Sequence, residues 1–168
     1  RCMIMKKVIS IFLMLCLMFS ISVPAFAADS DLSITVDSND VIALSDPIEP
    51  PEIISRGKAP QVTAVELYGY GWIDGTDHWG VIIKVTGVGS DTRKAYWNDT
   101  QLGLDDVSLY TYWLGADRTA VAFAYLYDCG PITEPGEYTF KTTYTSVNSP
   151  YTQKSISVNF TFEEVTSK

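Results

Sequence analysis

The chain has 168 residues with 20 acidic and 12 basic side chains, and its formal net charge is −8 at pH 7. An acidic surface repels phosphate backbones and anionic lipids, so neither nucleic acid nor a membrane surface is an expected partner. Of the three cysteines, Cys2 and Cys16 fall in a segment that we expect to be removed, and only Cys129 remains. No intramolecular disulfide can then form, which excludes small cystine-stapled scaffolds and leaves an apolar core as the source of stability.

The first 27 residues have the three parts of a secretory signal peptide, with residues 1–2 upstream of the first possible start. Lys6-Lys7 gives a positive start, residues 9–23 form an apolar run, and Ala25-Phe26-Ala27 places small residues where signal peptidase needs them. The alternative is a retained membrane anchor, but the run is short for a bilayer span, which needs about 20 residues. We therefore expect cleavage before Ala28 and a secreted, extracellular protein with no membrane partner. Nine basic residues would then face 20 acidic ones, for a net charge of −11.

Residues 28–60 differ in composition from the rest of the chain. They contain seven acidic residues against Arg56 and Lys58, together with four prolines. Charge repulsion and the fixed φ of proline favour an extended, partly disordered leader or linker. Residues 32–36 (LSITV) alternate like a strand and could pair with the domain, but we expect a spacer outside it.

From residue 61 to residue 168 the sequence is β-like throughout. Val, Thr, Tyr and Ile are dense, they alternate with a period of two, and turn residues interrupt them at short intervals. The expected strands are 62–72, 79–88, 93–98, 106–114, 119–128, 137–146 and 151–163. The last two have one apolar face, which includes Phe140 and Val158, and one polar face. Such strands are typical of antiparallel sheets packed face to face.

The sequence EPGEYTF opens the penultimate expected strand. Its Gly136-x-Tyr138 step resembles the tyrosine corner of immunoglobulin-like (Ig-like) sandwiches, in which the tyrosine hydroxyl bonds to nearby backbone. Phe140 stands where an antibody-type domain has its second cysteine, and the chain looks like the cysteine-free Ig-like modules of bacterial secreted and surface proteins. The resemblance covers residues 137–163 and, more loosely, the strand count. It implies an all-β, Ig-like antiparallel sandwich of about seven strands over 61–168, and no particular activity.

The segment WIDGTDHW joins the first two expected strands and holds the only histidine of the chain. Its candidate ligand-binding residues are Trp72, Asp74, Asp77, His78 and Trp79. Asp-Gly is a strong turn signal, so a hairpin loop is expected. The two tryptophans flank this turn and could clasp a ligand whose hydroxyl groups donate to the aspartates. Calcium needs six to eight oxygen ligands, so we expect neither a metal nor a cofactor.

A competing site lies on the strand expected at 106–114. Strict alternation puts Tyr110 and Tyr112 on one face, and Leu109 and Trp113 on the other. If the second pair belongs to the core, the two tyrosines face outward and present flat rings to a sugar or a peptide. The alternative is that these rings are ordinary core and cross-strand partners.

Cys129 closes an apolar strand, directly before Gly130-Pro131. A thiol in this position is either a small buried apolar group or, if exposed, a reactive thiol that can form an intermolecular disulfide. Burial is the interpretation that we favour.

Three classes of function remain. The leading one is a non-catalytic extracellular binding or adhesion module of a bacterial secreted protein, which recognises an exposed glycan or protein through surface aromatics. The alternative is a structural or assembly domain that pairs through an edge strand or an aromatic patch. A secreted hydrolase or inhibitor comes third, because the adjacent Asp105 and Asp106 would point to opposite faces of a strand and no nucleophile motif is present.

Overall fold

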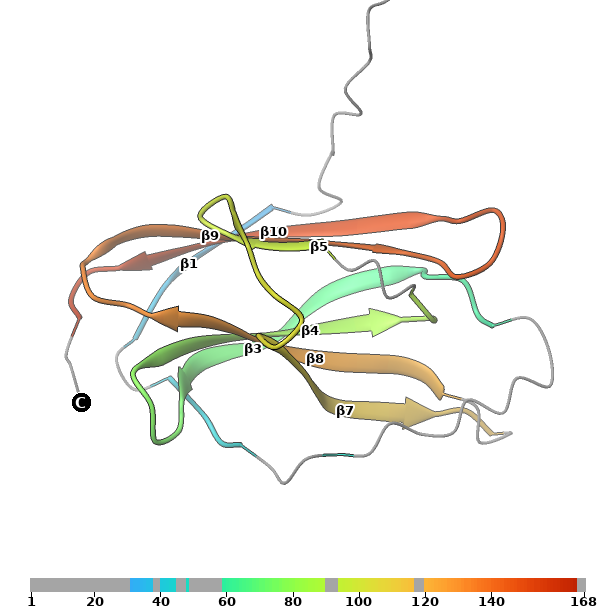
Figure 1. Ribbon diagram of the computed structural model, residues 1–168, viewed down its shortest axis with the longest axis horizontal. Coiled ribbons are helices and arrows are strands. Elements are labelled where there is room, and N and C mark those ends of the chain that lie inside the picture. Colours follow the sequence, from blue (N-terminus) through green and yellow to red (C-terminus); the bar gives the residue numbers. More distant parts are fainter. Residues whose placement is uncertain are drawn as a thin grey trace, which may run out of the picture.

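The computed structural model describes residues 31–37, 40–44, 48, 59–89, 94–116 and 120–165, and this part of the chain contains strands and no helix. Two five-stranded sheets form the two layers of a sandwich (Figure 1). Sheet A has the strand order β1-β10-β9-β5-β6, and sheet B has the order β2-β3-β4-β8-β7. The prediction of an all-β protein is confirmed. The described residues include no helix long and apolar enough to cross a membrane.

The seven strands expected after residue 60 all occur, and their ends differ from the expected ones by at most three residues. They are β3 (Ala64–Ile73), β4 (His78–Thr86), β5 (Lys94–Trp97), β7 (Val107–Leu114), β8 (Ala120–Pro131), β9 (Gly136–Thr145) and β10 (Gln153–Phe162). Three short strands were not expected as part of the sandwich, namely β1 (Asp31–Thr35), β2 (Val41–Ile42) and β6 (Thr100–Gln101).

β1 and β2 lie in the leader that we expected outside the domain, and the predicted boundary at residue 61 is wrong for both. β1 pairs in parallel with β10, Ile34 opposite Phe160, and β2 pairs in parallel with β3. Ile34 and Val36 pack against the core, whereas Asp31 and Asp37 are exposed. Without β1, β10 would be an edge strand with unpaired backbone groups, and this pairing outweighs the acidic composition. Residues 1–30, 38–39, 45–47 and 49–58, which include the expected signal peptide, lie outside the described residues.

The core lies between the sheets and is rich in aromatic rings. Its fully buried large side chains include Trp79, Ile83, Tyr127, Phe140, Tyr144, Ile156 and Phe160. Phe140 from sheet A meets Tyr127 from sheet B with 5.0 Å between the ring centroids. The apolar faces predicted for the last two strands are therefore the inward faces.

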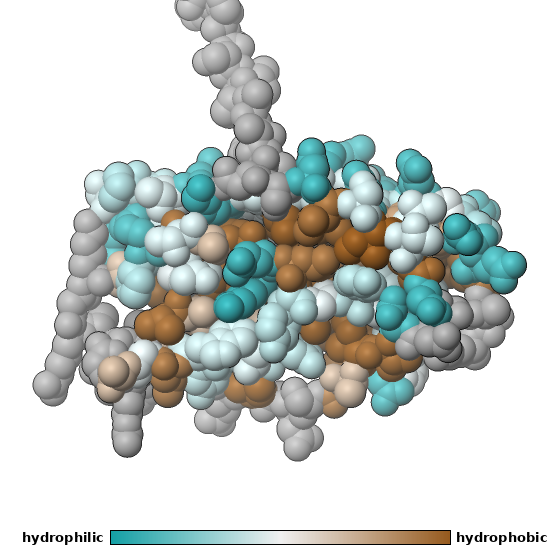
Figure 2. Space-filling view, turned by 180° about the vertical axis from the view of Figure 1, so that it is seen from behind, coloured by the Kyte–Doolittle hydropathy of each residue, from teal (hydrophilic) through white to brown (hydrophobic). Residues whose placement is uncertain are grey.

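The margin of this core reaches the surface on the side of the sandwich turned away in Figure 1. Figure 2 shows separate groups of hydrophobic side chains there, with paler and hydrophilic side chains between them. We interpret the groups that are level with the core as the edge of the core. The outer faces of the sheets are the separate surfaces on which a ligand could bind.

Register shifts interrupt three of the strand pairings in the described residues, and two of these shifts are β-bulges that affect the candidate aromatic residues. Pairing shifts between Leu67 and Gly69 on β3, which leaves Tyr68 as the extra residue. A second shift on β7 leaves Tyr110 as the extra residue. A bulge interrupts the period of two, so residues of equal parity before and after it lie on opposite faces of the sheet.

Candidate functional site

The hairpin between β3 and β4 forms where the sequence predicts a turn, but its tryptophans point into the protein. Trp79 is 0% exposed, and its ring meets Trp72 edge-on at 5.4 Å and Phe162 at 4.9 Å. Trp72 is half-buried. Trp79 lies on the inward face of β4 together with Val81, Ile83 and Val85. The two rings therefore do not form the solvent-facing clasp that the sequence predicts.

The polar residues of the hairpin form a small charged cluster with β8. His78 Nδ1 lies 2.9 Å from both carboxylate oxygens of Asp128, and His78 Nε2 lies 3.7 Å from Asp77 Oδ1. Asp128 also accepts a hydrogen bond from the Gly130 backbone N–H at 2.9 Å. Asp74 and Asp77 are exposed. The cluster thus links the hairpin to β8, and Asp128, 50 residues from His78, is the partner that sequence analysis missed.

The pKa of His78 is raised above its ordinary value of 6.5, chiefly because the ring bonds to the Asp128 carboxylate. Partial burial opposes this shift, and the negative charges of Asp128 and Asp77 add to it. A group whose pKa is higher in the folded state stabilises the fold when it is protonated. The contribution of His78 is therefore complete below the unfolded-state pKa and disappears as the pH rises through the folded-state pKa.

We expect His78→Gln to destabilise the protein more at about pH 5.5 than at about pH 9, because only the protonated ring gains from both carboxylates. The difference between the two penalties should stay below about 1 kcal/mol, since the pair is partly exposed and screened. Urea unfolding of the wild type and the variant at the two pH values, without added salt, measures this difference. Asp77→Asn is the control and should show a smaller change, because Asp77 is 3.7 Å from the ring. A penalty that grows with pH would contradict the assignment.

Tyr110 and Tyr112 do not share a face, and the predicted alternation of β7 is wrong. The bulge at Tyr110 leaves Tyr112 opposite Phe123, which packs with Val88 at one end of the protein. Tyr110 instead packs with Trp113 against a small apolar cluster on the outer face of sheet B. Both tyrosines are half-buried, and neither forms the outward pair that a ligand platform would need.

A different aromatic pair is presented on the outer face of sheet B. Tyr68, the bulge residue of β3, is 52% exposed, and its ring meets Trp113 edge-on at 5.6 Å. Lys84 Nζ lies 5.0 Å from the centroid of the Trp113 ring, which is a cation–π distance. Sequence analysis missed Tyr68 because strict alternation places it on the same inward face as Tyr70 and Trp72. The bulge at Tyr68 breaks this alternation.

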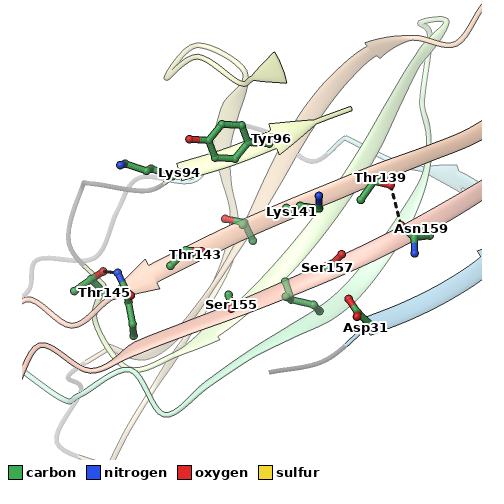
Figure 3. A pocket seen from close by; sticks show the side chains of 13 residues that line it. Asp31, Lys94, Tyr96, Thr139, Lys141, Thr143, Thr145, Ser155, Ser157 and Asn159 are labelled. Atoms are coloured by element: carbon green, nitrogen blue, oxygen red, sulfur yellow. Dashed lines mark hydrogen bonds between the residues drawn. The ribbon is translucent and has the colours of Figure 1, made fainter. Parts of the chain in front are cut away.

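The outer face of sheet A is hollowed into a cavity of ≈ 1080 Å³ (Figure 3). We call this cavity the polar hollow. The polar residues that line it include Asp31 from β1, Lys94 and Tyr96 from β5, Thr139, Lys141 and Thr143 from β9, and Ser155, Ser157 and Asn159 from β10. Most of the residues that line the polar hollow therefore carry a hydroxyl, amide or ammonium group.

Strand pairing arranges these side chains in rows across sheet A. One row consists of the successive cross-strand partners Tyr96, Lys141, Ser157 and Asp31, and the next consists of Lys94, Thr143 and Ser155. In a third row Thr139 Oγ1 donates to Asn159 Oδ1 at 2.8 Å. The sequence predicts the polar faces of the last two strands. It does not show that Lys94 and Tyr96 join the same face, because the pairing of β5 with β9 is a long-range contact.

Cys129 is 8% exposed and contributes to the core. Of the two alternatives for this thiol, burial is confirmed. Burial raises the pKa of Cys129 well above its ordinary value, and the carboxylates of Asp128 and Asp106 act in the same direction. The thiolate, which is the reactive form, is therefore disfavoured.

Gly136 and Tyr138, the residues on which the resemblance to a tyrosine corner rests, lie at the start of β9. The Tyr138 hydroxyl donates to the backbone carbonyl of Glu134 at 2.9 Å. Its ring stacks on Trp97 with 5.5 Å between centroids and an interplanar angle of 18°. Gly136, two residues before Tyr138, is the first residue of β9.

No three His, Cys, Asp or Glu side chains of the described segments lie together as a metal site. No protein-family model, no curated protein and no solved structure matches this chain significantly. A function must therefore be inferred from the chemistry of its own surfaces.

Proposed function

We propose that this protein is a non-catalytic extracellular binding module with an Ig-like fold, and that it recognises exposed glycans through the polar hollow. The observation that carries the proposal is the outer face of sheet A. There, the ring of Tyr96 lies beside rows of hydroxyl, amide and ammonium side chains that strand pairing holds in register (Figure 3).

The strand order supports the Ig-like part of the proposal. Taken in chain order, β3, β4, β5, β7, β8, β9 and β10 correspond to strands A to G of an Ig domain. Sheet B then contains A, B, E and D side by side, and sheet A contains G, F and C, as in the constant-type Ig sandwich. Trp97 is buried on β5, where Ig domains have their core tryptophan, and Phe140 lies opposite it on β9. The Tyr138–Glu134 hydrogen bond is consistent with this assignment.

The extracellular part of the proposal depends on the sequence pattern of residues 1–27. A basic start, an apolar run and a small-residue cleavage site direct a chain to export. These residues lie outside the described part of the structure.

The lining of the polar hollow suits a saccharide. Hydroxyl and amide groups both donate and accept hydrogen bonds, which matches the many hydroxyl groups of a sugar. The Tyr96 ring offers a flat apolar surface to the C–H face of a pyranose, with little loss of side-chain entropy. Among the described residues that line the polar hollow, Asp31 is the only carboxylate, whereas glycoside hydrolysis ordinarily uses two. A binding role is therefore better supported than a catalytic one.

A glycan array with the purified protein tests the proposal, followed by calorimetric titration of any glycan that binds. We expect Tyr96→Ala to weaken binding by about 5-fold or more, because one stacking contact contributes about 1 kcal/mol. Tyr68→Ala on sheet B is the matched control and should leave the affinity unchanged. Affinity for a single site should be weak, and multivalent display should increase it. If no glycan binds, or if both variants bind as the wild type does, the proposal is wrong.

One observation favours the alternative, an assembly domain. The exposed Tyr68 ring and Trp113 form an aromatic patch on sheet B, the kind of surface through which a second protein chain could associate. Sedimentation velocity over a concentration series distinguishes the two functions. Self-association that Tyr68→Ala abolishes would support assembly, whereas a monomer at all concentrations would leave glycan binding as the better proposal.

A further inference from the structure

We infer that the polar hollow selects negatively charged saccharides, whose anionic groups bind between Lys94 and Lys141. This inference rests on the proposed function of the same surface and narrows its ligand class. The property that leads to it is the local balance of charge on an otherwise acidic protein.

Positive charge is scarce in the described residues and is concentrated in this cavity. They contain four lysines, no arginine and 14 aspartates and glutamates. Two of these four lysines, Lys94 and Lys141, line the polar hollow, and among the described residues Asp31 is the only acidic one that lines it. An anion that the protein surface repels elsewhere therefore meets a locally positive surface on sheet A.

The two lysines are held close together by strand pairing. Tyr96 is the cross-strand partner of Lys141, and Lys94, two residues before Tyr96 on β5, is the partner of Thr143. Lys94 and Lys141 are thus diagonal neighbours on one face of an antiparallel pair, about 7–8 Å apart at the backbone. Their like charges repel each other, and an anionic group between them relieves this repulsion.

One described carboxylate lies near an ammonium group of this pair and a second lies farther along the row, and neither prevents ligand binding. Asp99 Oδ1 is 3.7 Å from Lys141 Nζ, but the two side chains are 92% and 54% exposed. An exposed pair of this kind is weak, and a bound carboxylate or sulfate can replace it. Asp31 stands at the far end of the row, two strands from Lys141.

The rest of the polar hollow can hold the sugar to which the anionic group is attached. Tyr96 lies opposite Lys141, so a pyranose ring stacked on Tyr96 places a substituent at its edge beside Nζ. Hydroxyl groups of Thr143 and Ser155 continue the row that begins at Lys94. The neighbouring units of an acidic oligosaccharide would then meet hydrogen-bonding groups along sheet A.

Titration with oligogalacturonate and with its fully methyl-esterified form tests the inference, because esterification removes the charge of each unit and adds only a methyl group. We expect the charged form to bind at least about 10-fold more tightly at low salt, with the preference declining as ionic strength rises. The double variant Lys94→Gln/Lys141→Gln should lose this preference. Lys84→Gln removes the same kind of charge from sheet B and should retain it, and Lys94→Arg/Lys141→Arg should retain it as well. Thermal unfolding of each variant confirms that it is folded.

The outcomes separate this inference from the proposed function. If both forms bind equally well and Tyr96→Ala weakens both, the selection for charge is wrong and glycan binding stands. If neither these two saccharides nor any glycan on the array binds, both proposals fail. If Lys84→Gln weakens binding of the charged form as much as the double variant does, the preference depends on the overall charge of the protein. Lys94 and Lys141 are then not the binding site for the anionic group. A sulfated oligosaccharide in the same titration shows which anionic group is preferred, and tighter binding of either anion than of the methyl ester supports the inference.

Discussion

Trp79→Ala is expected to lower the free energy of unfolding by about 3–5 kcal/mol, the range found for large aromatic residues in protein cores. The Trp79 side chain is 0% exposed, and its ring lies within 6.0 Å of the rings of Tyr70, Trp72, Phe160 and Phe162. Phe160 and Phe162 belong to sheet A, so the indole fills the space between the two layers. Its removal leaves a cavity that two sheets fixed by hydrogen bonds cannot close.

Trp79→Phe is the matched variant and should cost much less than Trp79→Ala. Trp79 Nε1 is buried and has no hydrogen-bond acceptor among the described residues, so phenylalanine keeps most of the apolar contact and removes an unsatisfied donor. Urea unfolding followed by circular dichroism measures both variants. A loss below about 1 kcal/mol for Trp79→Ala would show that the ring is not part of the core. It would then restore the solvent-facing clasp as a possible binding site.

The inward position of Trp79 is one that the alternation in the sequence predicts. Trp79 has the same parity as Val81, Ile83 and Val85, which the alternation already assigns to one face. Because the turn ends directly before His78, where β4 begins, the alternation of the strand includes Trp79. The neighbouring Asp-Gly turn predicts exposed loop residues, whereas the strand parity of Trp79 predicts a core position.

The errors on β7 and in the leader have a different origin. The bulge at Tyr110 depends on how β7 fits against β8, and no residue in β7 itself marks it. Similarly, β1 is stable as a strand only because β10 offers it an edge, and that edge is about 125 residues away in sequence. Local alternation therefore predicts that a strand exists, whereas its partner, its register and its bulges are decided by the whole sandwich.

In the candidate site, too, local alternation predicts some of the residues, and long-range strand pairing determines the others. The polar faces of β9 and β10 could be predicted from alternation, including Thr139, Lys141 and Ser157. The contribution of Tyr96 and Lys94 could not, because it depends on the antiparallel pairing of β5 with β9. The His78–Asp128 contact depends likewise on the pairing of β4 with β8. Sites assembled from several strands remain hidden until the order of the strands is known.

Gly87→Ala is expected to destabilise the protein by about 3 kcal/mol or more, because the added methyl group would collide with the backbone. Gly87 follows β4 with φ +99°, and a Cβ atom there would lie 2.0 Å from the carbonyl oxygen of Gln61 and 2.8 Å from Val62 Cα. The segment at Gln61 and Val62 is held in place, since the Val62 N–H donates to the buried Ser146 hydroxyl at 2.8 Å. Neither the backbone at Gly87 nor the backbone at Gln61 and Val62 can move without disrupting the segment that leads into β3.

Gly75→Ala separates this collision from the cost of the backbone conformation alone. Gly75 also has a positive φ, +74°, but a Cβ atom there would meet nothing within 4 Å. A left-handed conformation costs a non-glycine residue about 1–2 kcal/mol, and Gly75→Ala should show that cost only. Chemical unfolding of the two variants under one set of conditions gives the difference directly. Equal penalties would mean that the backbone at Gln61 yields to the methyl group; a penalty at Gly87 at least about 1.5 kcal/mol larger would show that the entry into β3 is rigid.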